Sequence, residues 1–79
     1  MSKKFTDTYL EAFTLDTVTS VRYSAPGAFE RFCGRSCLSY QACNAFNVRP
    51  SPQRCQLMAL GYWKVSGLVN ETGASHWAV

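Results

Sequence analysis

The chain has 79 residues, of which 47% are hydrophobic, 14% aromatic and 16% charged. This length allows one small core and excludes a two-domain enzyme with a cleft between lobes, and this composition excludes a disordered tail. The net charge of +3 is spread along the chain without a basic run, so nucleic-acid binding is not expected. No apolar run approaches the roughly 18 to 20 residues that cross a bilayer, so membrane insertion is not expected either. We expect residues 1–79 to form a single domain.

The first half of the chain predicts strands followed by a helix. Residues 8–15 and 17–23 are rich in β-branched and aromatic residues, which predicts two strands with a turn at Asp16-Thr17. After a break at residues 24–27, apolar side chains recur at helical spacing, which predicts an amphipathic helix over residues 28–39. Its apolar face carries Phe29, Phe32, Cys33, Ser36 and Cys37.

The second half predicts a hairpin and a closing strand. Residues 43–48 and 54–60 are strand-like, and the segment 49–53 between them contains two prolines, which predicts a loop. Glycines interrupt the segment 61–73, and residues 75–79 predict an edge strand. The hairpin therefore follows the helix directly in the chain.

The cysteines of the helix should not pair with each other. Cys33 and Cys37 lie one turn apart, with β-carbons ~5–6 Å from one another. A disulfide needs a separation of ~3.5–4.5 Å. Each helix cysteine therefore requires a partner in the hairpin.

The expected register of the hairpin supplies these partners. If Val48 lies opposite Arg54, then Cys43 and Cys55 fall on one face of the hairpin. The same face would carry Ala45, Leu57 and Ala59. A short connection makes the helix and the next strand antiparallel, so the bridges should be nested. We expect Cys37–Cys43 and Cys33–Cys55, and the larger loop should stabilise the fold by ~3 kcal/mol.

Zinc binding is the alternative use of four cysteines. Their spacing, C-x3-C-x5-C-x11-C, lacks the two paired knuckles of common zinc sites, and the only histidine, His76, is distant. We expect neither a metal nor another cofactor. His76 is interpreted as a packing or surface residue.

The disulfides predict a secreted or extracellular location. Residues 1–4 are not followed by a hydrophobic signal region, which fits either a cytosolic protein or a mature fragment behind an initiator methionine. Asn70-Glu71-Thr72 is a potential N-glycosylation acceptor, and it favours the extracellular interpretation.

Three short motifs resemble the core of the PAN/apple domain family. They are CGRSCL at residues 33–38, CNAFN at 43–47 and CQL at 55–57. The family pattern is C-x3-C before an apolar residue on a helix, C-x-[A/S]-F on a strand and C-x-L on the partner strand. Many apple domains have a further disulfide between their ends. No cysteine lies before Cys33 or after Cys55 here, so the chain looks like the minimal PAN version.

The resemblance implies an α+β fold in which a small, disulfide-stabilised antiparallel β-sheet cradles one α-helix. In that family the two disulfides are nested, in agreement with the geometric prediction. Its members bind proteins or carbohydrates, for example in clotting zymogens and parasite surface adhesins, and have no fixed ligand site. We therefore expect a non-catalytic extracellular module of a larger protein, with a protein or a glycan as its partner.

Aromatic residues interleaved with cations are the candidate contact residues, because Trp, Tyr and Arg are enriched in binding hot spots. The predicted ligand-binding residues are Arg49, Arg54, Tyr62, Trp63 and Lys64. Structural roles compete with this prediction. Trp63 and Trp77 would also serve to cover the open side of the sheet, and an arginine at a hairpin tip is usually only solvated.

A small secreted protease inhibitor or toxin-like effector is the alternative function. In that hypothesis the segment 49–54 presents Arg49 or Arg54 to a protease or a channel. An enzyme is not expected, because the sequence contains no paired carboxylates, catalytic triad or phosphate-binding loop.

Overall fold

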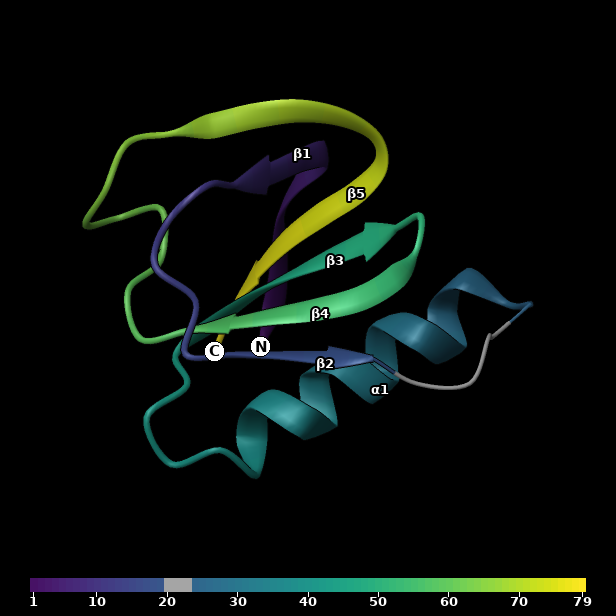
Figure 1. Cartoon of the computed structure of the whole chain (residues 1–79), viewed down its shortest axis with the longest axis horizontal. Coiled ribbons are helices and arrows are strands. Elements are labelled where there is room, and N and C mark those ends of the chain that lie inside the picture. Colours follow the sequence, from purple (N-terminus) through teal and green to yellow (C-terminus); the bar gives the residue numbers. More distant parts are fainter. Residues whose placement is uncertain (20–23) are drawn as a thin grey trace.

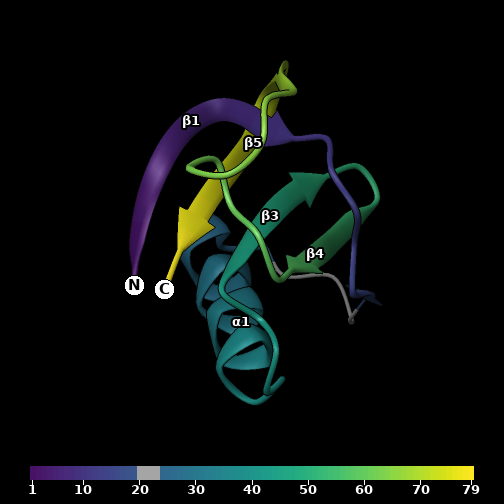
Figure 2. The same ribbon diagram turned by 90° about the vertical axis from the view of Figure 1, so that its left-hand side faces the viewer.

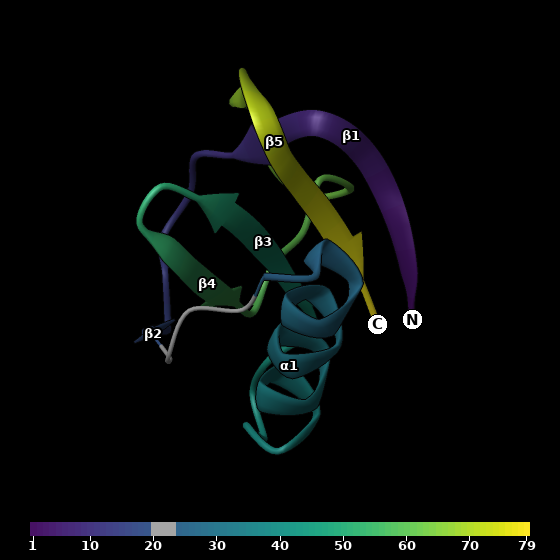
Figure 3. The same cartoon turned by 90° about the vertical axis from the view of Figure 1, so that its right-hand side faces the viewer.

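A computed structural model describes residues 1–19 and 24–79. In this part of the chain, five antiparallel strands form one sheet in the order β1-β5-β3-β4-β2, and one helix accompanies it (Figure 1). The elements are β1 (Ser2–Leu10), β2 (Asp16–Thr19), α1 (Pro26–Leu38), β3 (Ala45–Pro50), β4 (Gln53–Met58) and β5 (Leu68–Ala78). The side views show α1 against one face of the sheet (Figures 2 and 3). The predicted α+β class and antiparallel sheet are confirmed.

The helix forms where the apolar spacing predicted it. Proline stands in the first turn of α1, where its fixed φ suits a helix and its missing N–H is not needed. The apolar stripe faces the sheet, with Phe29 and Cys33 buried in a cluster that also contains Phe46. The helix ends at Leu38, and the N–H of Ser39 closes its last turn on the carbonyl of Arg35. The observed bounds differ from the predicted ones by two residues at the start and one at the end.

Both predicted disulfides are present. Cys33 is bonded to Cys55 and Cys37 to Cys43, with Cα–Cα distances of 5.4 and 5.3 Å. All four cysteines are therefore used in disulfides. The nested pairing joins α1 to β4 and to the segment that leads into β3.

The predicted register of the hairpin was wrong by one residue. Val48 lies opposite Cys55, not opposite Arg54, because the chain reverses over a two-residue turn and not over the predicted loop 49–53. Cys55 still faces α1 as expected. Ala45 instead lies on the other face, where it packs in a cluster with Leu10 and Met58. The large side chain of Phe46, and not a small alanine, therefore contacts the helix.

The two N-terminal strands do not pair with each other, and no turn separates them at the predicted position. β1 pairs with β5 at one edge of the sheet, and β2 pairs with β4 at the other edge. The predicted turn Asp16-Thr17 lies inside β2. Residues 20–23 of the predicted second strand lie outside the described residues. The predicted first strand, residues 8–15, was largely wrong: it shares only residues 8–10 with β1, and residues 11–15 form a loop. Strand-like composition also did not identify the partners of β1 and β2, which are distant in sequence.

The closing strand is longer and more central than predicted. β5 begins at Leu68, well before residue 75, and lies between β1 and β3. Its path is irregular at Gly73, whose φ of 87° is in the left-handed region. The N–H of Gly73 donates a hydrogen bond of 2.8 Å to a carboxylate oxygen of Asp7, which also has positive φ. This irregularity interrupts the alternation of apolar and polar residues, so the sequence pattern did not predict the full strand.

A network of hydrogen bonds lies on the face of the sheet that points away from α1. The Asn47 side chain accepts a hydrogen bond from the N–H of Leu10 and donates to its carbonyl, at 3.0 and 2.8 Å. It also donates to Gln56, and its Oδ1 lies 2.8 Å from Nδ1 of His76. Asn47 therefore joins the end of β1 to the centre of the sheet.

Candidate functional site

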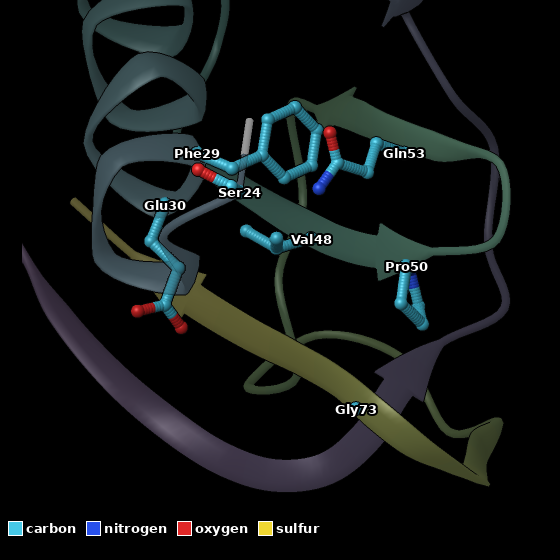
Figure 4. A pocket seen from close by; sticks show the side chains of 7 residues that line it. All are labelled: Ser24, Phe29, Glu30, Val48, Pro50, Gln53 and Gly73. Carbon is cyan, nitrogen blue, oxygen red and sulfur yellow. The ribbon is translucent and has the colours of Figure 1, made fainter. Parts of the chain in front are cut away.

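A cleft opens between the first turns of α1 and the outer end of the β3-β4 hairpin (Figure 4). β3 pairs with β5 only as far as Val48 opposite Ser75. The cavity beyond this pair has a volume of about 260 Å³. It is lined by Ser24, Phe29, Glu30, Val48, Pro50, Gln53 and Gly73.

The cleft combines an apolar wall with polar groups. Figure 4 shows the Phe29 ring and the Gln53 amide pointing toward one another above Val48. Pro50 forms the outer wall, where Gly73 of β5 approaches it closely: a Cβ on this glycine would lie 3.2 Å from the proline ring. An apolar surface with a few convergent polar groups is typical of ligand sites.

The Glu30 carboxylate is oriented by three residues. Lys3 forms an ion pair of 3.1 Å with Oε2 of Glu30, and the Ser75 hydroxyl donates to the same oxygen at 3.4 Å. The indole N–H of Trp77 donates to the Ser75 hydroxyl at 2.9 Å. Glu30 therefore lies turned toward β5, as seen in Figure 4, at the border between the cleft and the outer surface.

The walls of the cleft are held in place by the core. Phe29 and Val48 belong to the buried cluster that surrounds the Cys33–Cys55 disulfide. The disulfide fixes α1 relative to β4, so the two sides of the cleft are held at a constant separation. A preformed site of this kind loses little conformational entropy when a ligand binds.

The size of the cleft limits what it can hold. Its volume is below the ~300–1,000 Å³ of pockets for drug-sized ligands. It therefore fits one small group, such as a single sugar ring or one amino-acid side chain. Within residues 1–19 and 24–79, no cluster of three or more His, Cys, Asp or Glu side chains is placed to hold a metal ion.

The structure places the predicted contact residues Arg49 and Arg54 together, but away from the cleft. They are directly opposite one another across the hairpin, on the face that carries Asn47. The Arg49 guanidinium binds Glu71 with two hydrogen bonds of 2.8 and 2.7 Å and lies 3.8 Å from the centre of the Tyr9 ring. Its hydrogen bonds and charge lower the pKa of the Glu71 carboxyl, against the opposing effect of burial. Arg49 therefore has structural partners, and its binding role stays a prediction.

The other predicted contact residues form a separate group. Tyr62, Trp63 and Lys64 lie in the loop that follows β4. Arg54 lies four residues before the end of β4 at Met58, which separates the two groups by about 14 Å along the strand. The sequence prediction thus describes two surfaces and not one.

The loop aromatics are partly structural. The Tyr62 ring packs edge-on against Phe5 and His76, with centroid distances of 5.4 and 6.0 Å. Trp63 packs edge-on against Tyr62 and is 45% exposed. Trp77 instead packs on Phe46 at the α1 face. Trp63 therefore lies over the open face through Tyr62, whereas the expectation that Trp77 covers that face was wrong.

Two further predicted residues lie on β5. Asn70 is exposed, so its side chain is accessible, and its glycosylation stays a prediction. His76 is buried with 0% exposure and serves as a packing residue, which is one of the two roles expected for it. Burial lowers the pKa of His76 to about 4.

Sequence reasoning did not find the cleft. Its lining comes from the start of α1, the tip of the hairpin and the bend in β5, and no local motif connects these segments. The nearest signals were Pro50 and Gly73, which mark interruptions of regular structure but do not show that the interruptions meet.

The chain matches no protein-family model, no curated protein and no solved structure. The resemblance to the PAN/apple family therefore stays a prediction, based on the three cysteine-containing motifs. At 13 residues, α1 is too short to cross a bilayer, and the described residues contain no helix that could.

Proposed function

We propose that this protein is a non-catalytic extracellular recognition module of the PAN/apple type, which binds a carbohydrate or a protein partner. The cleft between α1 and the hairpin tip carries this proposal. Its single-group size and mixed lining suit a terminal sugar or one projecting side chain of a larger partner. Gln53 and Ser24 would provide hydrogen bonds, and Phe29 and Val48 the apolar surface.

The disulfides support the extracellular part of the proposal. Two structural disulfides are typical of oxidising compartments, and a domain of 79 residues gains a large part of its stability from such bridges. A scaffold stabilised in this way keeps its binding loops in one arrangement outside the cell. This property is useful for recognition because loops can vary on a constant frame.

The inhibitor hypothesis has less support. A protease inhibitor would have to present Arg49 or Arg54 to the enzyme. Arg49 is engaged by Glu71, and the Arg54 side chain donates to the carbonyl of Pro52 at 2.8 Å. Each arginine would have to break its own contact before its side chain could enter a protease pocket.

The proposal is tested by screening the oxidised protein on arrays of oligosaccharides and of peptides. Ser24→Trp should block the mouth of the cleft, and Gln53→Ala should remove a hydrogen-bonding group, so both should weaken the strongest binding observed. Gln41→Trp introduces the same side chain at an exposed turn beyond the helix and should leave binding unchanged.

Other outcomes would contradict the proposal. Binding that is lost in Arg54→Ala or Lys64→Ala but retained in the cleft variants would move the site to the opposite face or to the loop after β4. Inhibition of trypsin without binding to either array would instead support the inhibitor hypothesis.

A further inference from the structure

An apolar surface lies at the end of the sheet away from the hairpin tip. The loops 11–15 and 59–67 meet there, because the N–H of Glu11 donates to the carbonyl of Gly67 at 2.9 Å (left side of Figure 1). Between these loops is a hollow of about 240 Å³. We name this surface the loop-end patch; it consists of Ala12, Phe13, Leu15, Ala59, Leu60 and Val65.

The loop-end patch contains both a projection and a cavity. Phe13 is 82% exposed, the highest exposure among the large hydrophobic side chains of the described chain, and Leu60 is 50% exposed. Phe13 is one of the residues that line the hollow, and most of its side chain is nevertheless exposed to solvent. An exposed aromatic ring beside an apolar hollow is typical of an interaction site.

The charges around the patch have both signs. Glu11 and Asp16 are exposed at the two ends of the first loop, and Lys64 is exposed on the second loop. A two-fold axis through the patch would bring the acidic loop of one copy against the basic loop of the other. An interface of this type is isologous, since each copy contributes the same surface.

We propose that two copies of this chain associate through the loop-end patch, with the Phe13 ring of each copy in the hollow of the other. Each Phe13 ring then fills the hollow of the other copy, and Lys64 faces Glu11 and Asp16 of the other copy. The patch consists of six residues, fewer than the ~20–30 that each partner contributes to a standard interface. The association is therefore weak and depends on concentration.

The dimer does not rely on the proposed recognition function. The cleft is lined by the start of α1 and the hairpin tip, away from the patch, and it stays open when two copies meet. If the recognition function is correct, the dimer carries two clefts. Binding to a surface with repeated ligands then gains from a high effective concentration.

The test is sedimentation equilibrium of the oxidised protein over micromolar to millimolar concentrations. The average mass should rise from 8.8 kDa toward twice this value as the concentration increases. Phe13→Ser should weaken association by at least about tenfold, and Phe13→Leu should weaken it less. Leu38→Ser changes another exposed apolar residue, at the end of α1, and is the control that should leave the mass unchanged.

A charge exchange tests the orientation of the two copies. Lys64→Glu should weaken association, and adding Asp16→Lys should restore part of it. The residues changed are exposed, so circular dichroism should show the native fold in each variant.

Three results would overturn the dimer. One is a mass of 8.8 kDa at all concentrations. Another is association that Phe13→Ser leaves unchanged. The third is a monomer that binds vesicles containing phosphatidylserine through Phe13, which would assign the patch to a lipid surface.

Discussion

The face of the sheet against α1 contains both disulfides, whereas the opposite face is joined by the hydrogen bonds of Asn47. On the α1 face, Cys33–Cys55 crosses a buried apolar cluster. On the other face, Asn47 binds Leu10 and His76. A disulfide acts mainly by restricting the unfolded chain, but a buried polar network stabilises only if each member keeps its partners.

Because of this difference, the stability of the two faces responds to different conditions. The α1 face depends on the redox state of its sulfurs and tolerates changes of pH, since a disulfide does not titrate. The Asn47 face is insensitive to reductant, but its stability depends on the protonation of His76 and on the hydrogen bonds of the Asn47 side-chain amide. Each face can therefore be perturbed without directly changing the other.

The largest effect is expected for Asn47→Leu. This change leaves the N–H and the carbonyl of Leu10 and a nitrogen of His76 without their partner. Each unpaired buried group costs about 1–3 kcal/mol, so the free energy of unfolding should fall by about 4 kcal/mol. Urea unfolding measures this loss. Gln56→Leu removes one hydrogen bond of the same amide and should cost only about 1 kcal/mol, whereas equal losses would show that Asn47 does not organise this face.

The α1 face is tested by removing the disulfides in pairs. Cys33→Ala with Cys55→Ala opens the bridge with a sequence separation of 22, and should cost about 3 kcal/mol. Cys37→Ala with Cys43→Ala opens the bridge with a separation of 6, and should cost about 2 kcal/mol. Thermal and urea unfolding show which of the two variants loses more stability. If the smaller loop costs more, strain or packing outweighs the entropy of loop closure.

The two faces also differ in how well the sequence predicts them. The pairing of Cys33 with Cys55 could be predicted, because helix and strand periodicity fix the direction of each sulfur. The register of the same hairpin could not be predicted, because two nearby prolines are compatible with turns of different length. A shift of one residue moved Ala45 to the other face but kept Cys55 on the α1 side.

The opposite face and the cleft depend on contacts between distant segments. Asn47 appeared as an ordinary strand residue, because its partner Leu10 lies 37 positions away. The cleft likewise forms where Pro50 and Gly73 meet, and each of these residues alone indicates only a break in regular structure. Local patterns therefore identified the covalent frame but not the polar network or the cleft.

Acid should destabilise the Asn47 face. Burial lowers the pKa of His76 from the ordinary 6.5 to about 4, so protonation favours the unfolded chain. The stability from the neutral ring is complete above pH 6.5 and falls as the pH decreases toward 4. The expected loss is about 2 kcal/mol at pH 5. Urea unfolding at several pH values measures this slope.

His76→Gln is the matched variant for the acid effect. Glutamine keeps a hydrogen-bonding side chain but does not titrate in this range, so its unfolding free energy should change less between pH 7 and pH 5. A slope equal to that of the original protein would assign the acid sensitivity to another group.

The smallest effect is expected at the ion pair of Arg49 and Glu71, which extends the polar face toward the hairpin tip. The guanidinium binds both carboxylate oxygens, and lysine cannot reproduce this fork, so Arg49→Lys should cost about 1 kcal/mol. The side chains are 17% and 31% exposed, so added salt should reduce the effect only in part. A double-mutant cycle with Glu71→Gln measures the coupling. If the losses of stability in the two single variants simply add, the ion pair contributes no coupling energy, and the stability of the polar face comes from Asn47. If the two substitutions are coupled, Arg49 is a structural residue. Weaker ligand binding after its substitution would then not identify Arg49 as a binding residue.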